Sequence, residues 1–275
     1  MAQFGQGTGH DRLQFMRKSV LLVTFLSLVM VVSVAGLATA DSCEAASSAA
    51  SVASVKKIPI LVYHHIRAAK PYHPSTWSYK MSVSPDVFGK QMQWIVDHGY
   101  TTVTLDTYVA IMKGEIQGPV KPVVITFDDN NRTQLTHALP ILREKGLIGV
   151  FYLTTNRLQN KSFILASEVK QMSEWGMDIQ SHTIDHATMT YLTLKRLDQQ
   201  LTESKAVLEA ITGKPVRHIA YPSTASNKTV RERAAKAGYT TGSIMDPRPA
   251  SVKDDFFRLP RIMMIDTTNL TKVLP

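Results

Sequence analysis

The chain of 275 residues has almost no cysteine, and Cys43 is its only one. A lone cysteine near the start of the chain cannot form an internal disulfide, so the protein folds without disulfide bonds. Such a fold fits a bacterial envelope compartment but does not require one. Asp41 and Ser42 stand directly before Cys43 and make a poor context for lipid attachment.

The sequence also lacks any dense run of lysine and arginine with interleaved aromatic residues, although its net charge is +9 at pH 7. Nucleic acid is the competing partner for so basic a chain. No nucleic-acid-binding motif is present, so we expect no nucleic acid partner. The positive charge instead favours anionic or cell-surface polymers.

One uncharged apolar stretch extends from Val20 to Ala40. Basic residues precede it and the small residues of Ala38-Thr39-Ala40 end it, which is typical of a secretory signal cleaved after Ala40. An uncut stretch of this length would cross a bilayer, so a membrane anchor is the alternative for residues 1–40. The sequence therefore predicts a secreted or cell-envelope protein, tethered to the membrane if the segment is retained.

A Ser/Ala-rich stretch at residues 41–57 is typical of a flexible linker. No further break rich in Pro, Gly or Ser follows, so we expect residues 58–275 to form a single domain. A hydrophobic content of 44% is enough for an ordinary globular core.

Strand-like apolar runs alternate with helical periodicity through this domain. The first expected helix begins at the N-cap Ser84 and is closed by Gly99. The later ones are expected at residues 133–145, 167–175, 193–211 and 227–237, and a strand at 148–153. This alternation predicts a mainly parallel α/β sheet, which right-handed crossovers curl into a barrel or a doubly wound sheet.

The candidate catalytic residues each follow a short apolar run. The runs at 60–63, 123–127 and 178–181 are followed by His64, by Asp128 and Asp129, and by His182. The carboxyl ends of parallel strands meet on one rim, where α/β folds build their sites. Carboxylates and imidazoles gathered on one rim indicate a metal-assisted enzyme.

His182 and His186 are four residues apart, a spacing that on a helical turn would place both imidazoles on one face. With one aspartate they would form a three-ligand site with open positions, as in catalytic zinc centres. A zinc protease would carry glutamate directly after the first histidine, but Thr183 stands there, which disfavours that class. An aspartate after a strand also caps helices, so this interpretation depends on the histidine pair.

Between residues 67 and 82 lies an expected loop with several aromatic residues. Its side chains would either stack on sugar rings or pack as a lid. They include Tyr72, Trp77 and Tyr79.

Five motifs stand in an order that resembles the polysaccharide deacetylase family, also called NodB-like or carbohydrate esterase family 4. They are Leu61-Val62-Tyr63-His64, Thr126-Phe127-Asp128-Asp129, Ser181-His182-Thr183-Ile184-Asp185-His186, Ala220-Tyr221-Pro222 and Leu259-Pro260-Arg261-Ile262. The resemblance covers about residues 58–265 and is strongest to the branch that deacetylates poly-β-1,6-N-acetylglucosamine. It implies a single-domain α/β fold, a distorted (β/α) barrel of the NodB-homology type.

The resemblance also implies the metal site and the proton transfers. Asp129, His182 and His186 would hold a divalent metal, zinc first, with cobalt or nickel as alternatives. Asp128 would act as the general base and His64 as the general acid that protonates the leaving amine.

Other roles follow from the same motifs. Arg261 would orient Asp128 through a charge-assisted pair, with an ordinary surface ion pair as the open alternative. Tyr221, Pro222 and Ser223 would line the substrate site, with the backbone N–H after Pro222 holding the oxyanion. We expect His98, His137 and His218 to be structural, and His65 to be structural or to support the site residues from behind.

The sequence departs from the family pattern in two places, and the second affects the expected substrate. Asn130 and Asn131 follow the aspartate pair where glycine is common, but asparagine tolerates left-handed backbone, so the turn can survive. Ser223 and Thr224 replace Tyr-Gly, which removes a wall of the sugar pocket. The alternatives left open are deacetylation of peptidoglycan, chitin oligomers or xylan, and a non-catalytic glycan-binding protein on the same fold.

Overall fold

The computed structural model describes residues 55–68 and 80–274. The expected leader at 1–40, nearly all of the linker at 41–57 and the aromatic residues Tyr72, Trp77 and Tyr79 lie outside these ranges. Among the described residues, no helix has the length and apolar character needed to span a bilayer.

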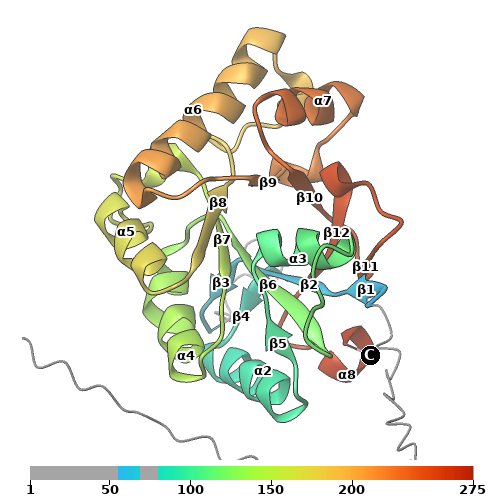
Figure 1. Cartoon of the computed structure of the whole chain (residues 1–275). Helices are drawn as coiled ribbons and strands as arrows, with labels where there is room; N and C mark the ends of the chain where they lie inside the picture. The colour runs from blue at the N-terminus through green and yellow to red at the C-terminus, as the bar shows by residue number, and fades with distance from the viewer. Residues whose placement is uncertain (1–54, 69–79, 275) are drawn as a thin grey trace, which may run out of the picture. The chain divides into compact units, whose positions relative to one another are not determined.

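Parallel strands close into a barrel in the order β2-β12-β10-β9-β8-β7-β6, and β6 pairs back to β2 (Figure 1). Their bounds are β2 Ile60–Tyr63, β6 Pro122–Asp128, β7 Val150–Leu153, β8 Asp178–Ser181, β9 His218–Ala220, β10 Thr241–Met245 and β12 Leu259–Met263. The strand β5 (Thr101–Thr102) pairs with β6 outside this ring. The closure confirms the predicted distorted (β/α) barrel and excludes the doubly wound alternative.

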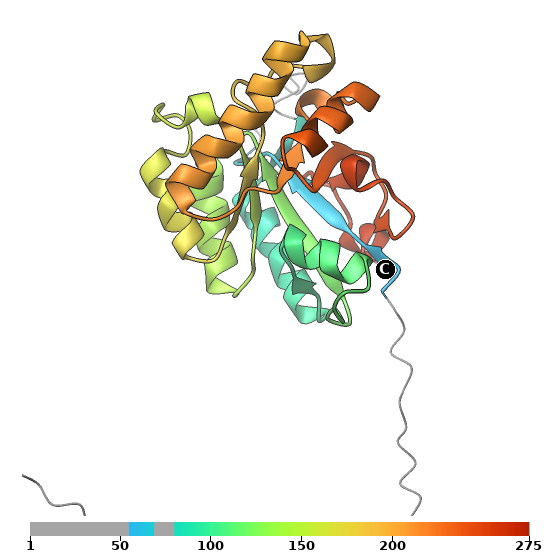
Figure 2. The ribbon, with the colours of Figure 1, turned by 45° about the horizontal axis from the view of Figure 1, so that its top comes forward.

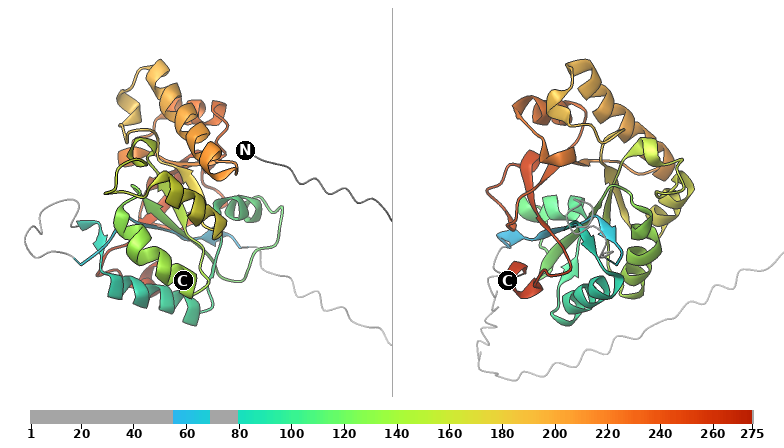
Figure 3. Two further views of the ribbon diagram at one scale, coloured as in Figure 1. Left: turned by 90° about the vertical axis from the view of Figure 1, so that its left-hand side faces the viewer. Right: turned by 180° about the vertical axis from the view of Figure 1, so that it is seen from behind.

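The helices lie around the strands, and all five expected ones are present (Figures 1 and 3). Their bounds are α2 Pro85–Asp97, α3 Leu105–Met112, α4 Leu139–Glu144, α5 Ala166–Glu174, α6 Leu194–Thr212, α7 Lys228–Lys236 and α8 Leu270–Val273. The longest, α6, lies beside α7 (Figure 2). Its end is set by Gly213, whose left-handed φ of 67° closes the helix.

The helix expected at 133–145 differs from the prediction because its first half is a π-helix, η1 (Gln134–Ala138), and α4 begins only after it. The Leu139 N–H bonds to the Gln134 carbonyl, five residues back. Pro140 has no N–H, and its ring excludes the carbonyl four residues earlier, so the ordinary α-helical ladder cannot run through this turn.

Alternate residues of the strands face two separate cores. On β6, Val123, Ile125 and Phe127 belong to the outer cluster, which includes residues of α2, α4, α5 and α6. Val124 belongs to the inner cluster together with Tyr108 of α3. Asp128 has the same parity as Val124, so the end of β6 delivers this carboxylate to the barrel interior.

Short elements complete the rims. β1 (Lys57–Ile58) pairs antiparallel with β11 (Ala250–Ser251), so the first strand includes the last residue of the expected linker. β3 (His65–Ile66) pairs with β4 (Ser82–Val83). Single turns of 3-10 helix occur at η2 (Thr155–Arg157), η3 (Met189–Tyr191), η4 (Pro222–Thr224) and η5 (Phe256–Arg258).

Candidate metal and catalytic site

A cavity of about 250 Å³ lies at the carboxyl ends of the barrel strands, where the apolar runs placed the candidate residues. It gathers nearly all of the residues predicted for catalysis, metal binding and substrate binding. Its lining is His64, Met81, Asp128, Asp129, Arg157, His182, His186, Tyr221, Ser223, Thr224, Met245 and Arg261. Pro222 is not among them, although its two neighbours are.

Three ligand atoms converge in this cavity. One from each of Asp129, His182 and His186 lie within 4.8 Å of one another. The Asp129 Oδ1 is 3.8 Å from His182 Nε2 and 3.3 Å from His186 Nε2. One carboxylate and two imidazoles at these separations fit a divalent cation with open positions for other ligands.

The ring of His182 is held in the orientation that a metal ligand needs. Its Nδ1 lies 2.8 Å from the Ala220 carbonyl, which accepts a hydrogen bond from that nitrogen and leaves Nε2 free to face Asp129. Burial lowers the pKa of His182, while the carboxylates of Asp128 and Asp129 oppose this shift. The neutral, ligating form of the imidazole is therefore favoured near neutral pH.

The expectation of a helical turn between the two histidines is wrong. His182 directly follows β8, and residues 182–188 are not helical. Thr183 has a φ of 71° and His186 a φ of 62°, both left-handed, which prevents a run of α-helical hydrogen bonds. The two rings nevertheless meet, with centroids 4.9 Å apart.

Asp128 and Arg261 form a buried, bidentate ion pair. Arg261 Nη1 donates to Asp128 Oδ1 and Nη2 to Oδ2, each at 2.7 Å. Arg261 is 1% exposed and Asp128 is 3% exposed, so this is not the surface ion pair left open by the sequence. Burial alone would raise the pKa of Asp128, but the charges of Arg261 and His182 hold it well below its usual value. The carboxylate is thus ionised, as a general base requires.

His64 lies beside this carboxylate at the end of β2. Its Nε2 is 4.0 Å from Asp128 Oδ2. Burial lowers the pKa of His64, against the opposing effect of Asp128 and Asp129. A protonated His64 is therefore a stronger acid than free histidine, which suits donation to a leaving amine.

The aspartate turn survives without glycine, as expected. Asp129 has a φ of 75° and Asn130 a φ of 40°. The Asn130 side chain secures the turn, because its amide group bonds to both the N–H and the carbonyl of Thr154. The hydrogen bonds of this fully buried amide thus hold the strained backbone of the turn in place.

Arg157 is a site residue that the sequence did not predict. It lines the cavity, and its Nη1 donates to the carbonyl and to Oδ1 of Asp129 at 3.2 Å and 3.3 Å. A signal was available, because Arg157 follows β7 by four residues and so belongs to the same rim.

The Tyr221-Pro222-Ser223 segment has two different faces. Tyr221 is only 2% exposed, whereas Ser223 is exposed and has a left-handed φ of 54°. Within the described residues, the buried Tyr221 hydroxyl has no hydrogen-bond partner. Tyr221 therefore lines the cavity with very little exposed surface, and Ser223 and Thr224 line it next to Tyr221.

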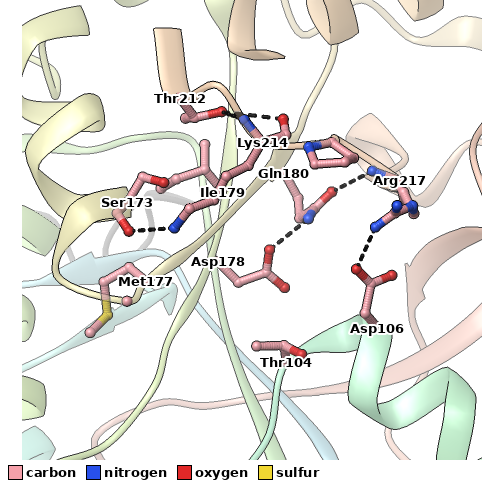
Figure 4. A pocket seen from close by; sticks show the side chains of 12 residues that line it. Thr104, Asp106, Ser173, Met177, Asp178, Ile179, Gln180, Thr212, Lys214 and Arg217 are labelled. Carbon is pink, nitrogen blue, oxygen red and sulfur yellow. Dashed lines mark hydrogen bonds and ion pairs between the residues drawn. The ribbon is translucent and has the colours of Figure 1, made fainter. Parts of the chain in front are cut away.

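A second cavity of about 210 Å³ lies at the opposite, amino-end rim (Figure 4). Here Arg217 pairs with Asp106 at 2.8 Å, and Lys214 donates to the Ser173 carbonyl at 2.7 Å. The buried His218 contacts the same Asp106 at 3.2 Å. His218 therefore belongs to this cluster of charged side chains and not to the cavity at the carboxyl rim.

The comparison with family models gives one match. The model described as polysaccharide deacetylase matches residues 115–242. This range includes the aspartate pair and both histidines, while His64 and Arg261 lie outside it.

Two curated relatives have similar sequences. YxkH of Bacillus subtilis, whose name assigns it provisionally to the polysaccharide deacetylases, is 27% identical over 75% of this chain and 71% of its own. The poly-β-1,6-N-acetyl-D-glucosamine N-deacetylase of Staphylococcus epidermidis is 26% identical over 74% of this chain and 78% of its own.

Two solved structures share the fold at comparable identity. The Streptococcus pyogenes deacetylase PplD, solved in complex with acetate, has a TM-score of 0.76 at 26% identity, covering 80% of this chain and 98% of its own. The polysaccharide deacetylase BC0361 of Bacillus cereus has a TM-score of 0.69 at 27% identity, covering 79% of this chain and 67% of its own.

Proposed function

We propose that this chain, which carries a polysaccharide deacetylase domain, removes N-acetyl groups from a polymer of N-acetylglucosamine with the help of a divalent metal. Poly-β-1,6-N-acetylglucosamine is the first candidate substrate, because a relative that is 26% identical is named for that activity. The observation that carries the proposal is the convergence of Asp129, His182 and His186 beside the Asp128–Arg261 pair.

The donor set fits a metal ion. His182 and His186 would supply imidazole nitrogens and Asp129 a carboxylate oxygen, a combination suited to zinc, with cobalt or nickel as alternatives. A cation held there would lower the pKa of a coordinated water and polarise the acetamide carbonyl.

The protein's own groups account for the proton transfers. Asp128, kept ionised by Arg261, accepts the proton of the attacking water. His64 donates a proton to the nitrogen as the C–N bond breaks, which releases acetate and a free amine. The Ser223 N–H is the candidate donor to the oxyanion, since Ser223 lines the cavity and a backbone donor does not depend on side-chain type.

Ser223 and Thr224 stand at the cavity where many family members have Tyr-Gly, so the test compares substrates. Purified protein with zinc, cobalt or nickel is incubated with β-1,6-linked N-acetylglucosamine oligomers, chitin oligomers, peptidoglycan and acetylated xylan, and released acetate is measured. We expect the fastest release from the β-1,6-linked oligomers and strongly reduced release from Asp128→Asn. No release from any polymer with any of the three metals would reject the hydrolase, and glycan binding that Asp128→Asn leaves unchanged would then indicate a binding protein.

The proposal includes a location outside the cytoplasm, secreted or in the cell envelope. The apolar stretch from Val20 to Ala40 and its small-residue ending support it. Sequencing the N-terminus of the protein recovered from cells would test it, with a new terminus at Asp41 expected.

A further inference from the structure

Two glutamines without any exposed surface, Gln134 and Gln200, contact the site from behind. Neither lines the cavity. Each uses its side-chain amide to bind the backbone of a segment that carries proposed catalytic or metal-binding residues. They belong to different elements and reach different halves of the site.

Gln134 joins the two segments that carry the proposed acid and base. Its Nε2 donates to the carbonyl of His64, at 2.8 Å, and to the carbonyl of Asp128. β2 and β6 are paired up to Tyr63 and Phe127, so these two carbonyls are one residue beyond the last paired positions. One amide group therefore bonds to the ends of both strands, just beyond their last paired residues.

The π-helix places Gln134 at this point. Gln134 is the first residue of η1, and its own N–H bonds to the Asn131 carbonyl at 2.9 Å. The preceding Thr133 accepts the N–H of Ile66 at 3.0 Å, so the start of η1 is fixed to the segment after His64. π-helical turns occur often at functional sites, and here the turn aims a buried donor at two catalytic segments.

Gln200 holds the turn between the metal-binding histidines. Its Oε1 accepts the N–H groups of Ile184 at 2.8 Å and Asp185 at 3.3 Å, and its Nε2 donates to Asp185 Oδ1 at 2.7 Å. The turn is strained, because Thr183 and His186 both have left-handed φ values. Such a turn persists only with support from its surroundings, and Gln200 provides three hydrogen bonds to it.

We propose that Gln134 and Gln200 are positioning residues that hold the two halves of the site separately. Gln134 fixes His64 relative to Asp128, and Gln200 fixes His186 relative to His182 and Asp129. The effect on turnover rests on the proposed deacetylase function, whereas the effects on metal affinity and on geometry do not.

The test uses methionine replacements, which keep the side-chain length and remove the amide. Gln134→Met is expected to lower kcat by about 100-fold, because even a small displacement of His64 relative to Asp128 slows the reaction. KM and the affinity for cobalt should be unchanged. Gln200→Met is expected to weaken cobalt binding by about 10- to 100-fold, and saturating metal restores most of kcat. Cobalt binding is followed by its visible absorption.

Gln180→Met is the matched control. Gln180 is also buried and accepts the N–H groups of Arg217 and His218, but it lies at the opposite rim (Figure 4). It is expected to lower the Tm without changing kcat or cobalt affinity. Gln134→Asn and Gln200→Asn, which keep the amide but shorten its reach, replace any methionine variant that does not fold.

The proposal is overturned if Gln134 and Gln200 variants lose turnover and metal affinity together, or if they differ from Gln180→Met only in Tm. If the parent releases no acetate, the proposed function fails, and two measurements still decide this inference. Gln200→Met must weaken cobalt binding, and a crystal structure of Gln134→Met must show the separation of His64 and Asp128 changed from 4.0 Å. Unchanged cobalt affinity or an unchanged separation would contradict it.

Discussion

The two ends of the barrel carry polar cavities of similar size, about 250 Å³ at the carboxyl rim and about 210 Å³ at the amino rim. Each is lined by aspartate and arginine side chains, and at the amino rim the buried His218 contacts the lining Asp106. At the amino rim, Arg217 pairs with Asp106, Lys214 donates to the Ser173 carbonyl, and Asp178 accepts the Leu105 N–H. At the carboxyl rim, Asp129, His182 and His186 bring three ligand atoms together.

Backbone conformation separates the two ends further. Six non-glycine residues with left-handed φ occur among the described positions, and all lie in the turns that build the carboxyl rim. They are Asp129, Asn130, Thr183, His186, Ser223 and Thr224. Strained residues persist where the surrounding structure enforces them, which is common at functional sites. Converging ligand atoms on strained turns thus distinguish the site from the opposite pocket, which size and polarity do not.

The largest expected difference between the rims is in turnover. Asp128→Asn removes the proposed base and should lower kcat for acetate release by about 10²- to 10⁴-fold, without loss of metal. Asp106→Asn, at the amino rim, should leave kcat near that of the parent. Equal losses in the two variants would mean that the carboxyl rim has no special role.

The next difference concerns the stability of the two arginine pairs. Arg261→Ala leaves the Asp128 carboxylate buried without its two arginine hydrogen bonds and should lower the free energy of unfolding by about 3–5 kcal/mol. Arg217→Ala breaks a pair whose side chains are 43% and 53% exposed, and should cost at most about 1 kcal/mol. Urea unfolding of both variants measures this, and similar losses would contradict the contrast.

A smaller effect is expected when the ring of Tyr221, which lies next to Ser223 in the chain, is displaced. A Cβ at Gly242 would lie 2.0 Å from the Tyr221 hydroxyl oxygen, so Gly242→Ala must displace the ring. We expect a loss of about 1–3 kcal/mol in unfolding free energy, together with lower kcat. Tyr221→Phe, which removes only a hydroxyl without a partner in the described structure, should be nearly neutral. A tolerated Gly242→Ala would show that the ring is not fixed there.

The smallest expected effect is on acid stability. Burial, followed by the charges of Arg67 and His64, lowers the pKa of His65 to about 4. Unfolded histidine has a pKa of about 6.5, so between about pH 6.5 and 4 the unfolded chain binds the additional proton. Stability contributed by neutral His65 is therefore complete above this window and lost as the pH falls through it. In His65→Asn, Tm should therefore depend less on pH in this window than in the parent. The same slope of Tm with pH in both proteins would exclude the effect.

Local patterns in the sequence predicted a parallel α/β sheet with the candidate residues on one rim, whereas the barrel, and not a doubly wound sheet, was implied by the resemblance to the polysaccharide deacetylase family. Apolar runs mark the strands, and parallel strands place Asp128, Asp129 and His182 on one rim whatever the details of the turns. The geometry of the histidine turn was not predictable from spacing alone, since the left-handed φ values of Thr183 and His186 have no signature in the four-residue spacing.

The supporting residues were missed for a different reason. Gln134 contacts His64 across 70 positions of sequence, and Arg157 contacts Asp129 across 28. Such contacts depend on how the closed barrel brings distant turns together, and a buried glutamine has no local signature. The exposed Ser223, in contrast, was visible in the sequence as a departure from the family pattern.

The most direct test of the account is the amount of zinc bound per chain after dialysis against a zinc buffer. His182→Gln and His218→Gln replace buried histidines at opposite rims of the same barrel. We predict about one zinc per chain in the parent and in His218→Gln, and almost none in His182→Gln. Zinc content that is unchanged in His182→Gln, or lost in His218→Gln, would contradict the metal site on which the proposed function depends.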